Sequence, residues 1–165
     1  MRIQQLGLQR YGHFSDQQLV LDCPASGCDL HLIVGPNETG KSTIREAICD
    51  LLYGFPQRSS MGFLHAMSDL EVTARISAGD ESLVFTRLKK RKNDLRGEDN
   101  TTLSPDELQA YIGNTDRSFY ERMFCFDREQ LQACARQMLD QDSDAGQILF
   151  ESSAGIQGLH KYQKA

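Results

Sequence analysis

The chain has 165 residues, of which 39% are hydrophobic and 25% are charged. These proportions are typical of a globular protein that buries a core, either as one domain or as one lobe of a larger domain. The net charge of −5 argues against a uniformly basic nucleic-acid surface. No apolar run approaches the ~18 residues of a membrane-spanning helix, so no membrane partner is expected. Five cysteines, an odd number without paired spacing, favour reduced thiols and a cytoplasmic location.

The charges are unevenly distributed along the chain. Between Arg87 and Arg96 there are six basic residues and one acidic residue, whereas the stretch from Glu98 to Glu151 has twelve acidic and four basic residues. A local basic patch is therefore compatible with the acidic net charge.

The first 22 residues predict two strands joined by a turn. Ile3, Leu6 and Leu8 lead to the turn Tyr11-Gly12-His13-Phe14, and a second apolar stretch, Gln18–Leu21, follows it.

The stretch Gly35–Thr43 matches the phosphate-binding pattern G-x-x-x-x-G-K-[ST] at every fixed position. The apolar run Leu30–Val34 before it predicts a buried strand. After it, a helical spacing of apolar residues predicts a helix from about Lys41 to Tyr53, ended by Gly54; these residues are Ile44, Ala47, Ile48, Leu51 and Leu52. Strand, glycine loop and helix form the structural context that this motif requires.

The residue types of the motif suit Mg·ATP. Gly35 and Gly40 allow backbone conformations in which successive N–H groups face a phosphate, and the helix N-terminus attracts the same anion. We expect Lys41 to reach the β- and γ-phosphates, Ser42 to contact Mg²⁺ and Thr43 to support the α-phosphate. The predicted nucleotide-binding residues are Gly35, Pro36, Asn37, Glu38, Thr39, Gly40, Lys41, Ser42 and Thr43.

Residues 70–88 predict an antiparallel hairpin, because apolar and polar residues alternate over 70–77, a turn follows at 78–80, and an apolar run returns over 83–88. The hairpin leads into the basic run Lys89, Lys90, Arg91 and Lys92. This run is either a solvated extension of the strand or a contact for DNA phosphates, and the sequence alone favours the solvated extension.

Three helices are predicted in the C-terminal part of the chain. Ser104-Pro105-Asp106-Glu107 carries the signals of a helix start, and that helix is expected to end near Gly113. A second helix follows residue 116, and its apolar residues are expected in the core rather than as a base-stacking platform; they are Phe119, Tyr120, Met123 and Phe124. A third helix is predicted over 127–138.

Hydrolysis by a P-loop protein normally needs a second motif, an apolar strand that ends in an acidic residue and holds the Mg²⁺ shell. Two segments of the chain resemble this motif. Leu19–Asp22 precedes the phosphate loop and fits the first hairpin better, and Ile148–Glu151 is short and flanked by loop residues. Both are rejected, so no catalytic residue is assigned, and the chain is expected to bind nucleotide without hydrolysing it alone.

These segments together resemble the start of the heads of SMC-like ATPases, and specifically the YhaN-type AAA domain, a relative of SbcC-type repair ATPases. The resemblance rests on the aromatic-Gly-x-Phe turn, the phosphate loop, the β-meander with a basic strand, and the stretches 124–132 and 149–156. It implies an α/β P-loop NTPase fold, in which residues 1–165 form the N-terminal lobe of an ABC/SMC-type head. An antiparallel β-meander would lie next to the phosphate-loop strand and helix, and the chain would end where a coiled coil begins.

The resemblance also implies partners and further contacts. A C-terminal lobe of the same head would supply the missing catalytic motifs, and a second head would complete a homodimer around two ATP molecules, with Asn37 near the interface. A Mg²⁺ contact is expected from the segment 124–132, with Asp127 or Gln130 as the alternatives. DNA would cross the engaged heads, where Lys89–Lys92 could contact it, and a nuclease subunit is a further expected partner. The full-length protein would be an ATPase in DNA repair or chromosome processing.

Two other classes of function stay open. A small-molecule P-loop kinase shares the strand–loop–helix start, although an antiparallel meander after the first helix is unusual for such kinases. The third alternative is a nucleotide-binding interaction module without catalysis.

Overall fold

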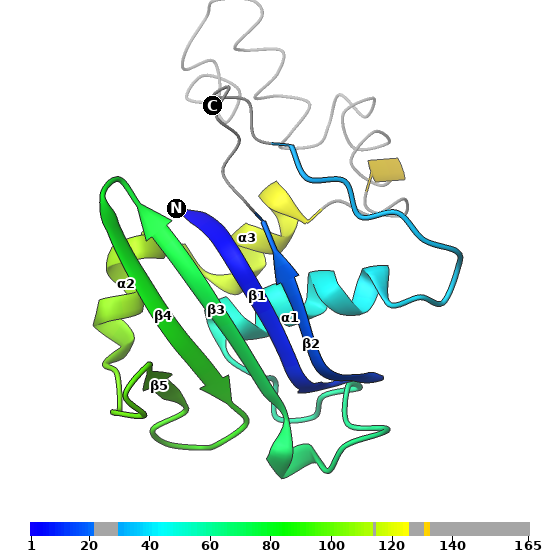
Figure 1. Ribbon diagram of the computed structural model, residues 1–165, viewed down its shortest axis with the longest axis horizontal. Coiled ribbons are helices and arrows are strands. Elements are labelled where there is room, and N and C mark those ends of the chain that lie inside the picture. The colour runs from blue at the N-terminus through cyan, green and yellow to red at the C-terminus, as the bar shows by residue number, and fades with distance from the viewer. Residues whose placement is uncertain (22–29, 114, 126–130, 133–165) are drawn as a thin grey trace, which may run out of the picture. The chain divides into compact units, whose positions relative to one another are not determined.

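The computed structural model describes residues 1–21, 30–113, 115–125 and 131–132. The chain divides into two units, residues 1–117 and residues 118–165. Figure 1 labels the strands and helices of the described residues. The first unit contains the phosphate loop and every strand of the described chain.

The first unit is built on a five-stranded antiparallel sheet with the order β2-β1-β3-β4-β5. Its strands are β1 (Arg2–Tyr11), β2 (Phe14–Val20), β3 (Glu71–Ala78), β4 (Glu81–Leu88) and β5 (Leu95–Gly97). The two predicted hairpins are confirmed: β1 pairs with β2 and β3 pairs with β4. Leu19 and Val20 pair with Leu6 and Gln5 inside the first hairpin, as expected, and Asp22 lies outside the described residues.

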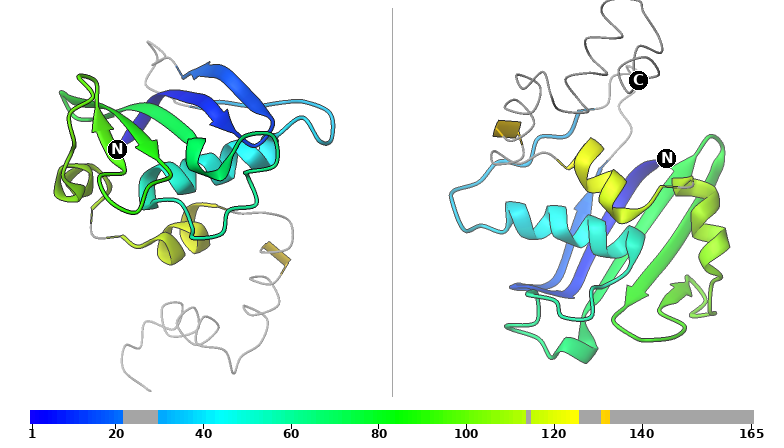
Figure 2. Two further views of the ribbon diagram at one scale, coloured as in Figure 1. Left: turned by 90° about the horizontal axis from the view of Figure 1, so that it is seen from below. Right: turned by 180° about the vertical axis from the view of Figure 1, so that it is seen from behind.

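The alternation in these strands directs the apolar side chains to one face of the sheet, where α1 (Lys41–Tyr53) packs. The helices α1 and α2 (Pro105–Ile112) lie on the same side of the sheet (Figure 2). The core between these layers contains Leu6, Leu8, Ile44, Ala47, Leu51, Leu52, Val72, Ala74, Ile76, Phe85, Leu95 and Leu108. The helical spacing seen in the sequence therefore marks most of the buried side of α1. Ile48 is only partly buried, and Cys49 and Asp50 are buried in addition.

The predicted end of α1 is confirmed. Gly54 follows the helix with φ +91°, a conformation that favours glycine, and its N–H donates to Asp50 O at 2.9 Å. The buried Arg87 of β4 donates to Leu51 O at 2.9 Å and to Leu52 O at 3.1 Å, so it satisfies carbonyls at the helix C-terminus that have no intrahelical partner. Asp94 pairs with the same guanidinium at 2.6 Å.

The helix start at Ser104 is also confirmed, as a capping box on α2. Asp106 N donates to Ser104 Oγ, and Ser104 N donates to Glu107 Oε1. The helix is followed by Gly113, as expected. A short 3-10 helix, η1 (Met67–Asp69), lies in the predicted loop between α1 and β3.

The predicted strand Leu30–Val34 is wrong. The segment has no strand structure, and its apolar side chains are exposed, with 89% of Leu30, 82% of Leu32 and 81% of Val34 accessible. A strand forms only when a neighbour pairs with its backbone, and none of the described strands is a neighbour of this segment. The apolar composition of a segment does not reveal whether another strand is available to pair with it.

The basic run Lys89–Lys92 does not extend the strand β4, which corrects the expectation of a solvated strand extension. The strand β4 ends at Leu88, and residues 89–94 form a loop that turns the chain back, with Leu88 N donating to Asp94 O at 2.8 Å. Asn93 takes a left-handed conformation with φ +53°, as residues in tight turns often do. The turn leads into β5, a short strand that the sequence analysis did not predict.

The described part of the second unit contains most of α3 (Arg117–Phe124), which confirms the second predicted helix. The expectation that its apolar residues are core is wrong for Phe119, Met123 and Phe124, which are exposed. The third predicted helix is described only at residues 131 and 132, which are helical. The rest of it, and the stretch 133–165, lie outside the described residues. No helix in the described ranges is both long and apolar enough to cross a membrane.

Candidate functional site

The phosphate-loop motif lies directly before α1, as its chemistry requires. Residues 37–40 turn the chain and the helix begins at Lys41. Gly40 has φ +94°, which a residue with a side chain rarely adopts. A Cβ at this position would also lie 2.4 Å from His13 Cε1 and 2.5 Å from Phe14 Cζ. Glycine is therefore required here both by backbone conformation and by the close approach of the β1–β2 turn.

The loop is held together by contacts among its own residues. Thr39 Oγ1 donates to Pro36 O at 2.8 Å, and a Cβ on Gly35 would lie 2.7 Å from the same Oγ1. The Lys41 ammonium donates to Gly35 O at 2.8 Å and to Pro36 O at 2.5 Å. The loop thus bends around the lysine, whose charged group lies within the motif itself.

Neither the N-cap nor the first turn of α1 supplies a side chain that neutralises the positive end of this helix. Gly40 offers no side-chain cap, and the first turn contains no acidic residue. The unpaired N–H groups and the helix dipole at such a position favour an anion. Lys41 and Ser42 are both exposed, so an anion reaching this position would meet the ammonium and the hydroxyl.

The turn between β1 and β2 forms one wall beside the loop. A Cβ on Gly12 would lie 2.7 Å from Thr43 Cγ2, and Gly12 N donates to Met61 O at 3.0 Å. The exposed His13 ring lies against the Phe14 ring, with a centroid separation of 4.1 Å. The turn was predicted from the sequence, but His13 was not predicted as a site residue. The close approach of the His13 ring to Gly40 places it beside the phosphate loop.

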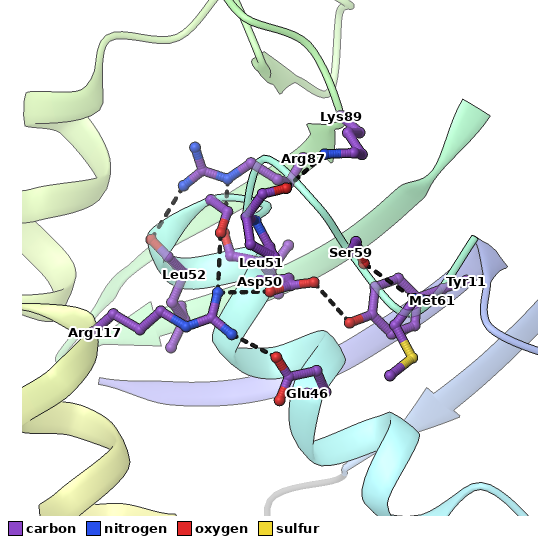
Figure 3. Close-up of polar contacts among 12 residues, drawn as sticks. Tyr11, Glu46, Asp50, Leu51, Leu52, Ser59, Met61, Arg87, Lys89 and Arg117 are labelled. Carbon is purple, nitrogen blue, oxygen red and sulfur yellow. Dashed lines mark hydrogen bonds and ion pairs between the residues drawn. The ribbon is translucent and has the colours of Figure 1, made fainter. Parts of the chain in front are cut away.

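Behind the loop, a charge cluster forms around the buried Asp50 of α1, and it was not predicted from the sequence (Figure 3). Asp50 is fully buried, and its two oxygens have separate donors: Tyr11 OH at 2.8 Å and Arg117 at 2.7 Å. Arg117 also pairs with Glu46 at 2.5 Å and donates to Gly54 O at 3.2 Å. The signal in the sequence was the pair Glu46 and Asp50, like charges one helical turn apart, a spacing that is destabilising and that a nearby cation relieves.

Burial is the largest influence on the pKa values of Asp50 and Tyr11. Loss of solvation raises the pKa of Asp50 above its ordinary value, although the hydrogen bonds from Tyr11 and Arg117 oppose the shift. Burial also raises the pKa of Tyr11, and the neighbouring Asp50 carboxylate adds to that effect. Tyr11 therefore remains a hydroxyl donor to Asp50.

The remaining predicted site residues are only partly described by the structure. Asp127 and Gln130, the alternatives for a Mg²⁺ contact, lie outside the described residues. Where side chains are described, no group of three or more His, Cys, Asp and Glu is arranged to hold a metal ion. In the basic run, the Lys89 ammonium donates to Pro56 O at 2.6 Å and to Gln57 O at 3.2 Å, whereas Lys90, Arg91 and Lys92 are exposed.

Comparisons with known proteins agree with the motif. A family profile described as "AAA domain" matches residues 1–165. The chain is 27% identical over 98% of its length to the uncharacterised protein YhaN of Bacillus subtilis (strain 168), and the match covers 16% of that protein. The chain thus spans less than a fifth of the length of this relative. With a match along its whole length, the chain belongs to the AAA domain family, whose members are P-loop nucleotide-binding proteins.

Proposed function

We propose that the loop Gly35–Thr43 binds Mg·ATP. The observation that carries this proposal is the N-terminus of α1, which has no side-chain cap or acidic first turn and which begins with Lys41 directly after the left-handed Gly40. On binding, the Lys41 ammonium would exchange Gly35 O and Pro36 O for the β- and γ-phosphates. The loop N–H groups would face the phosphates, and Thr43 would support the α-phosphate.

The described residues fit Mg²⁺ only through the nucleotide. Ser42 is an exposed hydroxyl residue of the motif in the first turn of α1, and no carboxylate cluster lies within the described part of the chain. Mg²⁺ commonly keeps several waters and binds through substrate phosphates with few protein ligands. We therefore assign Ser42 to the metal together with the phosphate oxygens; Asp127 or Gln130 would add a further contact.

We further propose that residues 1–165 are the N-terminal lobe of an SMC-like ATPase head. The exposed apolar run Leu30–Val34 supports this proposal, because it has the composition of a strand but lacks a described neighbour. A C-terminal lobe of the same protein would pair with this run and supply the acidic catalytic residues. Two such heads would engage around ATP, and the whole protein would act on DNA, with a nuclease subunit as a further partner.

The antiparallel sheet favours this assignment over a small-molecule kinase, in which parallel strands usually follow the first helix. A nucleotide-binding interaction module without catalysis is the remaining alternative, and it differs from the proposal only in the activity of the full-length protein.

Calorimetry with Mg·ATP tests the binding proposal on the full chain and on Lys41→Ala. We expect wild-type binding and an affinity loss of about 100-fold in the variant, because charge-assisted contacts of about 3 kcal/mol disappear. Arg58→Ala, which removes an exposed cation from the loop after α1, is the matched control and should bind like the wild type. Equal affinity in wild type and Lys41→Ala would refute the assignment.

Phosphate release measured on the same samples separates the alternatives. The proposal expects negligible turnover by the chain alone and ATPase activity of the full-length protein. Robust turnover by the 165 residues would contradict the composite site, and an inactive full-length protein would favour the interaction module.

A further inference from the structure

Arg117 joins three separate stretches of the first unit at one point. Its guanidinium contacts Glu46 and Asp50 on one side of α1, and it donates to Gly54 O at the end of that helix. Through Asp50 it is linked to Tyr11, the last residue of β1. Figure 3 shows the guanidinium directed toward both carboxylates, with the Tyr11 hydroxyl approaching Asp50 from the opposite side.

The cluster depends on Arg117 for its charge balance. Asp50 is fully buried, and Glu46, whose side chain is 33% exposed, lies four residues before it on the same helix, so the two carboxylates repel each other. Tyr11 is neutral and can donate a hydrogen bond, but it cannot neutralise a charge. Arg117 is the cation that both carboxylates share, and its planar fork allows one nitrogen for each of them.

The cluster is connected to the phosphate loop through two elements, α1 and the β1–β2 turn. The helix that carries Glu46 and Asp50 begins at Lys41, so its rotation and axial position fix where Lys41 and Ser42 lie. Tyr11 is followed at once by Gly12 and His13, whose backbone and ring lie against Thr43 and Gly40. A change in the cluster would therefore move the lysine and the adjacent wall of the site relative to each other.

We propose that Arg117 is a positioning residue for the phosphate loop: by holding Glu46 and Asp50, it fixes α1 against the β1–β2 turn in the arrangement that accepts the nucleotide phosphates. The inference rests on the proposed binding of Mg·ATP. It adds a requirement that the motif does not contain, from a residue 74 positions after Thr43. Since Arg117 is the last residue of the first unit, the cluster also lies where the chain leaves that unit.

Linkage makes the proposal testable in both directions. If Arg117 favours the arrangement that binds phosphate, then bound nucleotide must favour the cluster by the same factor. Nucleotide should therefore slow hydrogen exchange at residues 46–54 of the wild type, and this effect should shrink when Arg117 is replaced. A residue that only stabilises the fold would leave the affinity of the folded protein unchanged.

The experiment measures the Mg·ATP affinity of the full chain by calorimetry, at a temperature where the unfolding curve of each variant shows it folded. We expect Arg117→Ala to weaken binding by about tenfold and Arg117→Lys to recover part of the loss, because a lysine restores the charge but not the bidentate geometry. Arg58→Ala removes an exposed cation and should retain wild-type affinity.

The results distinguish failure of the positioning role from failure of the nucleotide site. If wild type binds and folded Arg117→Ala binds equally well, the positioning role is refuted and the nucleotide site stands. If the wild type does not bind Mg·ATP, the proposed function fails and the inference fails with it. Should Arg117→Ala not fold, Arg117→Lys and Asp50→Asn carry the test; unchanged affinity and unchanged nucleotide protection in both would overturn the proposal.

Discussion

Single residues of this protein owe their roles to contacts far along the chain. Asp50 lies in α1 but is not part of the apolar stripe of that helix. It is nevertheless fully buried, because Tyr11 and Arg117 donate hydrogen bonds to its two carboxylate oxygens. Lys89 belongs to a basic run, yet its ammonium binds two carbonyls of the loop after α1. Residue type alone would have placed both side chains in water.

The buried carboxylate predicts a pH dependence of stability. Since burial raises the pKa of Asp50 above 3.8, the folded state binds the proton more tightly than the unfolded state. The stability of the wild type should therefore fall as the pH rises from about 4 through the raised pKa, whereas Asp50→Asn lacks this titration. Urea unfolding from about pH 4 to pH 7 should show the free-energy difference between wild type and Asp50→Asn shifting against the wild type with increasing pH. Parallel profiles would contradict the prediction; Asp80→Asn, at the β3–β4 turn, controls for the loss of one carboxylate.

At the scale of elements, the two N-termini of α1 and α2 are treated differently. The α2 terminus is satisfied by its own capping box, from Ser104 and Glu107. The α1 terminus has neither a side-chain cap nor an acidic first turn. A helix whose first N–H groups have no side-chain cap and lie beside a lysine can bind an external anion. A side-chain cap instead stabilises the helix itself.

The capping box gives a prediction for the stability of α2. Replacing Ser104 by alanine removes the acceptor for Asp106 N, and this should lower the free energy of unfolding by about 1 kcal/mol. Ser82→Ala, at an exposed position of β4, removes a hydroxyl that caps no helix and should change stability by less than about 0.5 kcal/mol. Thermal or urea unfolding measures both variants; equal values would show that the cap contributes nothing.

At the scale of the whole molecule, the charge asymmetry of the sequence becomes a basic loop at one end of the sheet. Of its four cations, Lys89 holds the neighbouring loop, and Lys90, Arg91 and Lys92 are exposed. The proposed DNA contact therefore falls on three residues rather than four.

Charge reversal tests this contact in the full-length protein. Lys90→Glu with Arg91→Glu should weaken DNA binding and reduce the slope of log affinity against log salt by about 2, one for each lost phosphate contact. The matched control is Arg58→Glu with Arg75→Glu, which changes the charge equally at exposed positions outside the loop. If both pairs of substitutions have the same effect, only the net charge matters and the loop makes no specific contact.

The sequence by itself determined the elements whose signals are local. Both hairpins, the limits of α1, the capping box of α2 and the start of α3 follow from residues within a few positions of one another. The family followed from the combination of the phosphate-loop motif with the other segments of the chain.

The tertiary structure decided what depends on distant partners. Leu30–Val34 is strand-like in composition but remains exposed, because the described strands offer it no neighbour. The strand β5 is short, and it forms because β4 is already there to pair with it. The cluster of Tyr11, Asp50 and Arg117 joins residues up to 106 positions apart, so no local pattern could reveal it. Strand backbones and buried polar side chains need hydrogen-bond partners that are close in space. For these residues the partners come from distant parts of the chain.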